Sequence, residues 1–292
     1  DIINNNGDLA IITLKKFAPS LYRRTELYRD TDEINQDFTM IGYGKKGIGD
    51  TGVIDSSDNT TKLITQNTFD TNIGTYADLP YVNFTWDLIE TATLVADFDN
   101  GLPSNDALGY YLDIDDLGVG DMEGMIAVGD SGGPALIDNE IAGIAAFTTT
   151  KDFPTAPDIN DILDNSFGEI GAWTRVSYYQ EWIDKTVRSN YENTPTTADE
   201  VETTIIENDE SIEYTYFLLE ILGNRNNIDD IVTWDYTTID GTATANEDYI
   251  PVSGTLTLYA DESSIIIPVE ILGDTVAEVD ETFYLELSNS SY

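Results

Sequence analysis

The sequence has no histidine and no cysteine in 292 residues. Histidine is the commonest general base and the commonest transition-metal ligand in proteins, so proton transfer here must use another side chain or a histidine from outside this sequence. Without cysteine, the fold cannot depend on disulfides or on thiolate-bound metals. The lack of cysteine fits either an oxidising compartment without bridges or the cytosol, and it does not decide between them.

Basic residues are scarce as well. The chain has 13 Lys and Arg against 55 Asp and Glu, for a formal net charge of −42. A surface this negative repels phosphate backbones and anionic lipid headgroups, which excludes nucleic acid as a partner. No apolar run approaches the roughly 18–20 residues that a membrane-spanning helix needs, so we expect no membrane span.

The acidic residues are concentrated towards the C-terminus. Residues 199–292 hold 22 acids and a single base, Arg225, whereas residues 1–198 hold 33 acids and 12 bases. The stretch Ser189–Ala198 is polar, lacks apolar periodicity and contains Pro195, as linkers often do. We therefore expect one domain at 1–188, a linker at 189–198 and a second domain at 199–292.

Short runs of β-prone residues bounded by Gly, Asp and Asn predict a mainly β protein. In the first segment we expect strands at Asp8–Leu14, Thr39–Tyr43, Ala135–Ile137, Ile141–Thr148 and Ala172–Val176, with the strands from Asp50 to Gly120 unassigned. Helical spacing of apolar residues behind Ser177, which can cap a helix, predicts one amphipathic helix at Ser177–Val187. In the second segment we expect sandwich strands at Tyr214–Leu222, Ile231–Tyr236, Gly254–Tyr259, Ser264–Ile271 and Thr282–Leu287, with Val201–Ile206 as a candidate sixth.

The sharpest motif is Gly-Asp-Ser-Gly-Gly-Pro at Gly129–Pro134. Glycines on both sides of Ser131 allow a tight backbone turn that presents the hydroxyl to a substrate. The N–H groups of Gly129 and Ser131 can then serve as an oxyanion hole beside the nucleophile. The alternative is a glycine-rich turn that happens to contain a serine.

This motif resembles the nucleophile motif of the trypsin-like (chymotrypsin-fold) serine endopeptidases. Other segments are similar to that family in the same order, and the resemblance implies that Asp8, in Asn6–Leu14, is the triad carboxylate. The remaining similar segments are Ile41–Gly44, Ile141–Phe147 and Gly171–Val176. The implied fold of residues 1–188 is a partial chymotrypsin-like double β-barrel with a C-terminal helix.

The sequence departs from the family at its N-terminus. In the family the histidine precedes the aspartate and the serine, so the resemblance implies that an upstream segment supplies the histidine. The sequence begins at Asp1 without an initiator Met or a signal-peptide pattern, and we expect it to be part of a longer, secreted polypeptide. The family counterpart of Asp130 is neutralised by a new amino terminus, which is not in this sequence.

The resemblance also implies a substrate pocket. Met125 lies six residues before Ser131, where the family has the pocket floor, and Thr148 and Gly171 occupy the wall positions. With no acid at the floor, we expect apolar or small substrate side chains before the cut bond. An alternative is that insertions shift this alignment and that Met125 is only a core residue.

A separate acidic segment, Asp97–Gly101, reads Asp-Phe-Asp-Asn-Gly. Its alternating oxygen-bearing side chains are typical of calcium loops, although the later Glu of a complete EF-type loop is missing. In so acidic a chain, a solvated turn is the competing interpretation.

The second segment contains Thr237–Tyr249, Gly254–Leu256 and Ile271–Phe283, which resemble the Calx-β domain in sequence and in order. Carboxylates gathered on loops at one end of a sandwich repel one another unless a hard cation bridges them, so Ca²⁺ is the expected cofactor. We expect it to be bound by Asp248, Asp274, Glu278 and Glu281, with Glu207 completing the set by resemblance. The alternative is a solvated acidic rim without bound metal.

Together these features predict a secreted trypsin-like serine endopeptidase joined to a calcium-binding Calx-β module with an immunoglobulin-like β-sandwich. The expected partners are a peptide or protein substrate and the upstream segment that supplies the histidine. The family adds a last strand beyond the residues that match Leu285–Ser288, so we also expect that a strand donated by another chain could complete the sandwich. The competing hypothesis is a structural or adhesive protein that uses an inactive protease fold as a scaffold.

Overall fold

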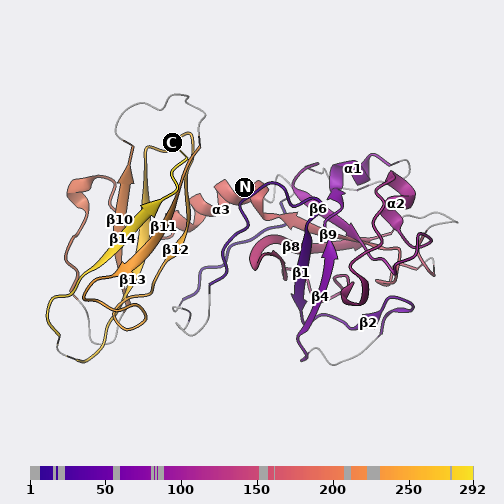
Figure 1. The fold of residues 1–292 in the computed structure, drawn as a ribbon, viewed down its shortest axis with the longest axis horizontal. Coiled ribbons are helices and arrows are strands. Elements are labelled where there is room, and N and C mark those ends of the chain that lie inside the picture. Colours follow the sequence, from indigo (N-terminus) through magenta and orange to yellow (C-terminus); the bar gives the residue numbers. More distant parts are fainter. Residues whose placement is uncertain are drawn as a thin grey trace. The chain divides into compact units, whose positions relative to one another are not determined.

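The computed structural model describes residues 7–15, 18, 24–54, 60–79, 82, 84, 89–150, 157–160, 162–206, 212–221, 231–276 and 278–291. The chain divides into two compact units, one made chiefly of Arg24–Ile183 and the other chiefly of Asp184–Tyr292. Figure 1 shows both units with most of their helices and strands labelled. The fold is mainly β, as the sequence predicted.

The first unit is built on one antiparallel sheet whose strand order is β4-β1-β7-β8-β9-β6-β5. Its strands are β1 Asp37–Gly42, β4 Leu63–Thr68, β5 Thr71–Asn72, β6 Thr93–Asp97, β7 Pro134–Ile137, β8 Glu140–Thr149 and β9 Ile170–Arg175. A separate small ladder joins β2 Gly47–Ile48 to β3 Gly52–Val53. The helical elements are α1 Ile73–Ala77, α2 Ala107–Leu112, the 3₁₀ turn Gly120–Met122 and α3 Val176–Ser189. The predicted strands that correspond to β1, β7, β8 and β9 are confirmed, as is the predicted helix.

The seven-stranded sheet is curled, and the chain connectivity shows why. Strands β4 and β5 are the two edges of the sheet, yet only Phe69 and Asp70 separate them in the sequence. The three Cα–Cα steps from Thr68 to Thr71 span at most about 11 Å, so the opposite edges must lie close to each other, as in a barrel. The backbone N–H of Asp70 donates to the carbonyl of Val95 on β6 (3.0 Å), which ties the turn to the far edge.

Aromatic rings fill the interior of this curled sheet. Phe38 stacks on Phe69 with ring centroids 3.8 Å apart, and Trp173 meets both rings edge-on at 5.0 and 5.6 Å. All three side chains are almost fully buried. They come from β1, the β4–β5 turn and β9, so the core joins the two halves of the sheet.

The predicted strand at Asp8–Leu14 is wrong. Residues 7–14 are described without strand structure, and Ile12 and Leu14 are 82% and 66% exposed. The apolar run is therefore not buried on either face of a sheet. The segment is held at one described point, where the Thr174 hydroxyl donates to the Asp8 carbonyl oxygen (2.9 Å).

A buried ion pair fixes the start of α3. The fully buried carboxylate of Glu33 accepts from Nε and Nη2 of Arg175, which is itself mostly shielded from solvent. The hydroxyl of Ser177 donates to the same carboxylate. Because the helix already begins at Val176, Ser177 does not act as the predicted N-cap.

The second unit is a small β-sandwich. Its strands are β10 Ile212–Glu220, β11 Val232–Asp240, β12 Ser253–Leu258, β13 Ser264–Leu272 and β14 Phe283–Ser288, after a 3₁₀ turn at Ala198–Glu200. Strand β10 pairs with β13, and β11 lies between β12 and β14. The predicted strands are confirmed, but Val201–Ile206 is described without strand structure, so the candidate sixth strand is wrong there.

Two apolar clusters lie between these sheets. Leu258 and Ile267 are buried in one, and the other stacks the Tyr249 ring on Phe283 with centroids 4.4 Å apart. Strand β14 pairs only with β11 among the described strands, so its other edge has no described partner. No helix in the described part of the chain is long and apolar enough to cross a membrane.

Candidate functional site

The loop Gly129–Pro134 leads directly into β7 and exposes Ser131. Gly129 and Gly132 have φ angles of 103° and 82°, which favour glycine because other residues rarely adopt them. The N–H groups of Asp130, Gly132 and Gly133 donate to the carbonyls of Ala127, Ala145 and Asp130 at 2.8–2.9 Å. By contrast, the N–H groups of Gly129 and Ser131 donate to none of the residues that the structure describes.

The carboxylate of Asp130 anchors this loop through two hydrogen bonds to backbone N–H groups. Its Oδ1 accepts from the N–H of Gly44 (2.7 Å) and its Oδ2 from the N–H of Ala127 (3.0 Å). A Cβ atom on Gly42 or Gly44 would lie 2.0 or 2.4 Å from the carboxylate oxygens, so both glycines are needed for this close approach. Two backbone N–H groups, 86 residues and three residues away in sequence, thus hold this carboxylate.

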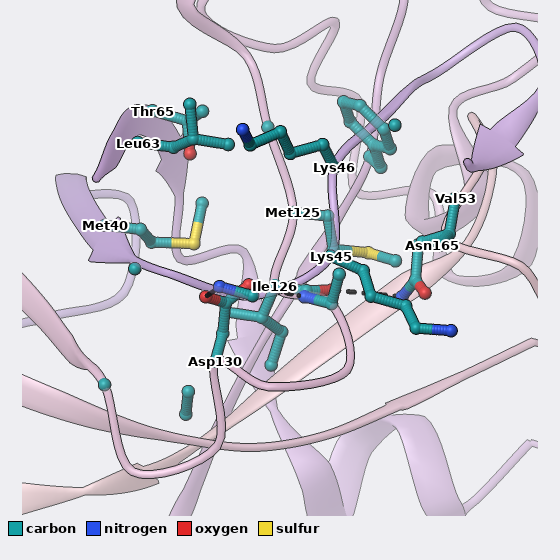
Figure 2. A pocket seen from close by; sticks show the side chains of 18 of the residues that line it. Met40, Lys45, Lys46, Val53, Leu63, Thr65, Met125, Ile126, Asp130 and Asn165 are labelled. Carbon is teal, nitrogen blue, oxygen red and sulfur yellow. Dashed lines mark hydrogen bonds between the residues drawn. The ribbon is translucent and has the colours of Figure 1, made fainter. Parts of the chain in front are cut away.

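A pocket of about 320 Å³ lies beside the anchored loop. Figure 2 shows Met40, Lys45, Lys46, Met125 and Asp130 among the side chains that line it. Ser131, Thr148 and Gly171 are absent from the described lining residues. The pocket therefore borders the loop on the Asp130 side.

The three predicted pocket residues do lie together. Thr148 and Gly171 are directly opposite each other on β8 and β9. A Cβ on Gly171 would lie 3.4 Å from Cγ of Met125, so the methionine side chain lies against that glycine. Met125 is half-buried, packs against the core and also lines the pocket beside the Gly129–Pro134 loop.

Asp8 is exposed, and its described contact is made by its backbone oxygen rather than by its carboxylate. No described contact joins Asp8 to Ser131. A direct bond between the two is not required in a triad, because the base stands between the carboxylate and the nucleophile.

In the second unit, carboxylate oxygens of Asp248, Glu278 and Glu281 lie within 4.8 Å of one another. Asp248 follows β11 and the two glutamates precede β14, so the fold brings separate loops together. The Oδ2 of Asp248 accepts from the N–H of Thr244 (2.6 Å), which orients that carboxylate. Asp274 is exposed and outside this described group of three, and Glu207 lies outside the described residues.

A second group of carboxylates lies inside the first unit and includes two residues of Asp97–Gly101. Asp97 and Asp99 are only 1% and 3% exposed, so the solvated turn is wrong. Their carboxylate oxygens lie within 4.8 Å of each other and of the carboxylate of Asp106, which is 4% exposed. Asp106 was not singled out from the sequence, although an Asp directly before a helical run is a usual N-cap signal.

Burial and mutual repulsion perturb these acids. Burial and, to a smaller extent, repulsion by the carboxylates of Asp97 and Asp106 together raise the pKa of Asp99 to about 10. The pKa of Asp97 rises to about 7, again mainly through burial, against the opposing effect of the N–H of Leu108. Glu123, whose pKa burial also raises to about 7, lies close by.

The comparisons with known proteins bear mainly on the second unit. Residues 192–292 match the Calx-beta domain family. Among solved structures, calcium binding domain CBD12 of CALX1.1 is 29% identical over 27% of this chain and 32% of that chain, with a TM-score of 0.24. The apo form of the Calx CBD1 domain is also 29% identical, over 27% of this chain and 66% of that one, with a TM-score of 0.24.

One solved structure corresponds to a larger part of the chain. Neuropsin, a serine protease expressed in the limbic system of mouse brain, is 16% identical over 56% of this chain and 54% of its own, with a TM-score of 0.36. The chain thus spans about a third of the CALX1.1 structure and about half of neuropsin. A search of curated protein sequences gives no match. The family match thus covers residues 192–292 and does not extend to the first unit.

Proposed function

We propose that this chain carries the nucleophile-bearing part of a secreted trypsin-like serine endopeptidase, followed by a Calx-beta domain that binds calcium. The observation that carries the proposal is the hydrogen-bonding pattern of the Gly129–Pro134 loop. Its other N–H groups are paired, whereas those of Gly129 and Ser131 have no described acceptor and flank an exposed hydroxyl. Unpaired, preorganised N–H groups of this kind stabilise the oxyanion that forms during acyl transfer.

In this mechanism Ser131 attacks the peptide carbonyl, and Asp130 holds the loop in place through Gly44 and Ala127. A serine hydroxyl is a poor nucleophile at neutral pH unless a base accepts its proton. Since the sequence has no histidine, that base comes from a segment outside these residues. The exposed carboxylate of Asp8 would orient the incoming imidazole.

The residues of the Calx-beta domain fit a hard divalent cation. Asp248, Glu278 and Glu281 supply only oxygen ligands, which calcium prefers, and they come close enough for one ion to contact all three. Asp274, which follows β13, and Glu207 would complete the coordination. Bound calcium neutralises repelling carboxylates, and the proposed role of the domain is calcium-dependent rigidity or attachment.

Labelling with a serine-directed phosphonate tests the protease proposal. The chain alone should react negligibly, because removal of a triad member leaves only about 10³–10⁴-fold catalysis over water. Addition of the histidine-bearing segment should give one label per chain, and Ser131→Ala should abolish it. Stoichiometric labelling of Ser131 in the chain alone would refute the mechanism.

The absence of histidine favours one other function, an adhesive protein that uses the protease fold as an inert scaffold. In that case, no labelling should occur with or without the added segment. Calcium binding by the Calx-beta domain would persist under both proposals.

A further inference from the structure

We propose that Asp97, Asp99 and Asp106 form a calcium site in the first unit, separate from the Calx-beta domain. Calcium binding by these residues does not require the proposed protease activity. The fold gathers the three acids from separate positions in the chain.

Three different local structures deliver the three carboxylates. Asp97 ends β6, Asp99 lies in the turn after it, and Asp106 is the N-cap of α2. The Oδ2 of Asp97 accepts from the N–H of Leu108 (2.7 Å), and the Oδ1 of Asp106 accepts from the N–H of Gly109 (2.5 Å). The start of α2 therefore fixes two of the carboxylates, and one oxygen from each of the three lies within 4.8 Å of the others.

A second observation points to a missing ligand. The Asp99 side chain is buried, with only 3% of the residue exposed, yet its Oδ1 has no hydrogen-bond partner. Glu123 also has a buried oxygen, Oε1, without a partner, while its Oε2 accepts from the N–H of Val119 (2.8 Å). Buried carboxylate oxygens are costly to leave unpaired, so such atoms in a folded protein normally face a ligand, an ion or water.

The two unpaired oxygens belong to one region. A Cβ on Gly118 would lie 2.7 Å from Oε2 of Glu123 and 2.9 Å from Cβ of Asp99, so both side chains approach the same glycine. None of these carboxylates forms an ion pair with a basic side chain in the described part of the chain. The cluster thus has no described positive partner, and the unpaired oxygens of Asp99 and Glu123 are free to bind a cation.

The ligand chemistry selects calcium. Every donor is a carboxylate oxygen, which disfavours zinc and other metals that prefer nitrogen or sulfur. Calcium accepts six to eight oxygens in flexible geometry, so three aspartates, Glu123 and water would satisfy it. Magnesium requires a smaller, nearly ideal octahedron and should bind more weakly.

An acidic pocket borders the cluster. The pocket of about 590 Å³ is lined by Asp37, Asp70, Asp115 and Asp116, and also by Gly118. The Oδ2 of Asp70 accepts from the N–H of Asp97 (3.3 Å), so one wall of the pocket directly contacts the cluster. A negatively lined opening raises the local concentration of cations.

Hydrogen exchange on the full chain, with calcium alone as the probe, tests the site by location. In the parent protein, calcium should slow exchange in peptides that cover 93–99 and 107–112, in addition to any effect within 192–292. Magnesium should give a weaker effect at equal concentration, and zinc should give none. Calcium-dependent protection confined to 192–292 would overturn the proposal.

Substitution then identifies the ligands. Asp99→Asn should reduce calcium affinity at 93–112 at least tenfold and leave the response of the Calx-beta domain unchanged. Asp138→Asn removes the same charge from an exposed hairpin residue and should behave as the parent. Unchanged protection at 93–112 in Asp99→Asn would refute the assignment; if that variant does not fold, the exchange pattern of the parent decides alone.

Discussion

Neutralisation of Glu281 should have opposite effects on the Calx-beta domain with and without calcium. The carboxylate oxygens of Asp248, Glu278 and Glu281 lie within 4.8 Å of one another. At that separation two unit charges repel by about 0.9 kcal/mol in water, and physiological salt roughly halves this value. The substitution Glu281→Gln removes two of the three repelling pairs, so without calcium the variant should be more stable by about 1 kcal/mol.

Calcium should reverse this order. A ligand at 100 times its dissociation constant stabilises the folded parent by about 2.7 kcal/mol. If loss of the Glu281 carboxylate weakens calcium binding about a hundredfold, the same calcium concentration stabilises the folded variant by only about 0.4 kcal/mol. In calcium the parent should therefore be the more stable protein by about 1 kcal/mol.

Urea-dependent hydrogen exchange of peptides from β11 and β13 measures this stability within the second unit, which separates it from calcium effects elsewhere. Glu286→Gln, an exposed substitution on β14 outside the cluster, is the matched control and should keep the calcium response of the parent. The reasoning fails if Glu281→Gln has the same sign in calcium and in chelator, or if its calcium response equals that of the parent.

Three further predictions concern the first unit. Glu33→Gln should destabilise it by about 3–5 kcal/mol in urea unfolding, because the charge of Arg175 loses its buried partner; a change below 1 kcal/mol would contradict the ion-pair argument. Burial raises the pKa of Glu169 to about 7, so the folded state binds the proton more tightly, and stability present below pH 4.5 is lost as the pH rises through 7. Glu169→Gln should therefore flatten the stability profile between pH 4.5 and 7, by up to about 3 kcal/mol, and an unchanged profile would refute this. When the histidine-bearing segment is supplied, a peptide library should show preference for apolar or small residues before the cut bond, since Met125 offers a basic side chain no partner; strong preference for Lys or Arg would show that Met125 is not at the pocket floor.

Local patterns in the sequence were enough to predict several strands and the long helix of the first unit. The strands that became β1, β7, β8 and β9 were predictable because short β-prone runs are bounded by turn residues, and the helix α3 because its apolar residues recur at helical spacing. The same reasoning failed for Asp8–Leu14, where Ile12 and Leu14 are exposed and the described residues form no strand. A run of residues can specify a strand-like pattern, but only a neighbouring strand can supply its hydrogen bonds.

The candidate sites show the same division. The motif at Gly129–Pro134 was visible because glycines at fixed positions around a serine specify a local turn, and the carboxylates of Asp248, Glu278 and Glu281 were visible through resemblance. The sequence could not show that Asp130 is anchored by Gly44, which is 86 residues away. It also left Asp97–Gly101 open between a solvated turn and a calcium loop. Tertiary structure excludes the solvated turn, because burial of Asp99 and its approach to Asp106 depend on where β6 ends and α2 begins in space. Sequence spacing alone does not encode that distance.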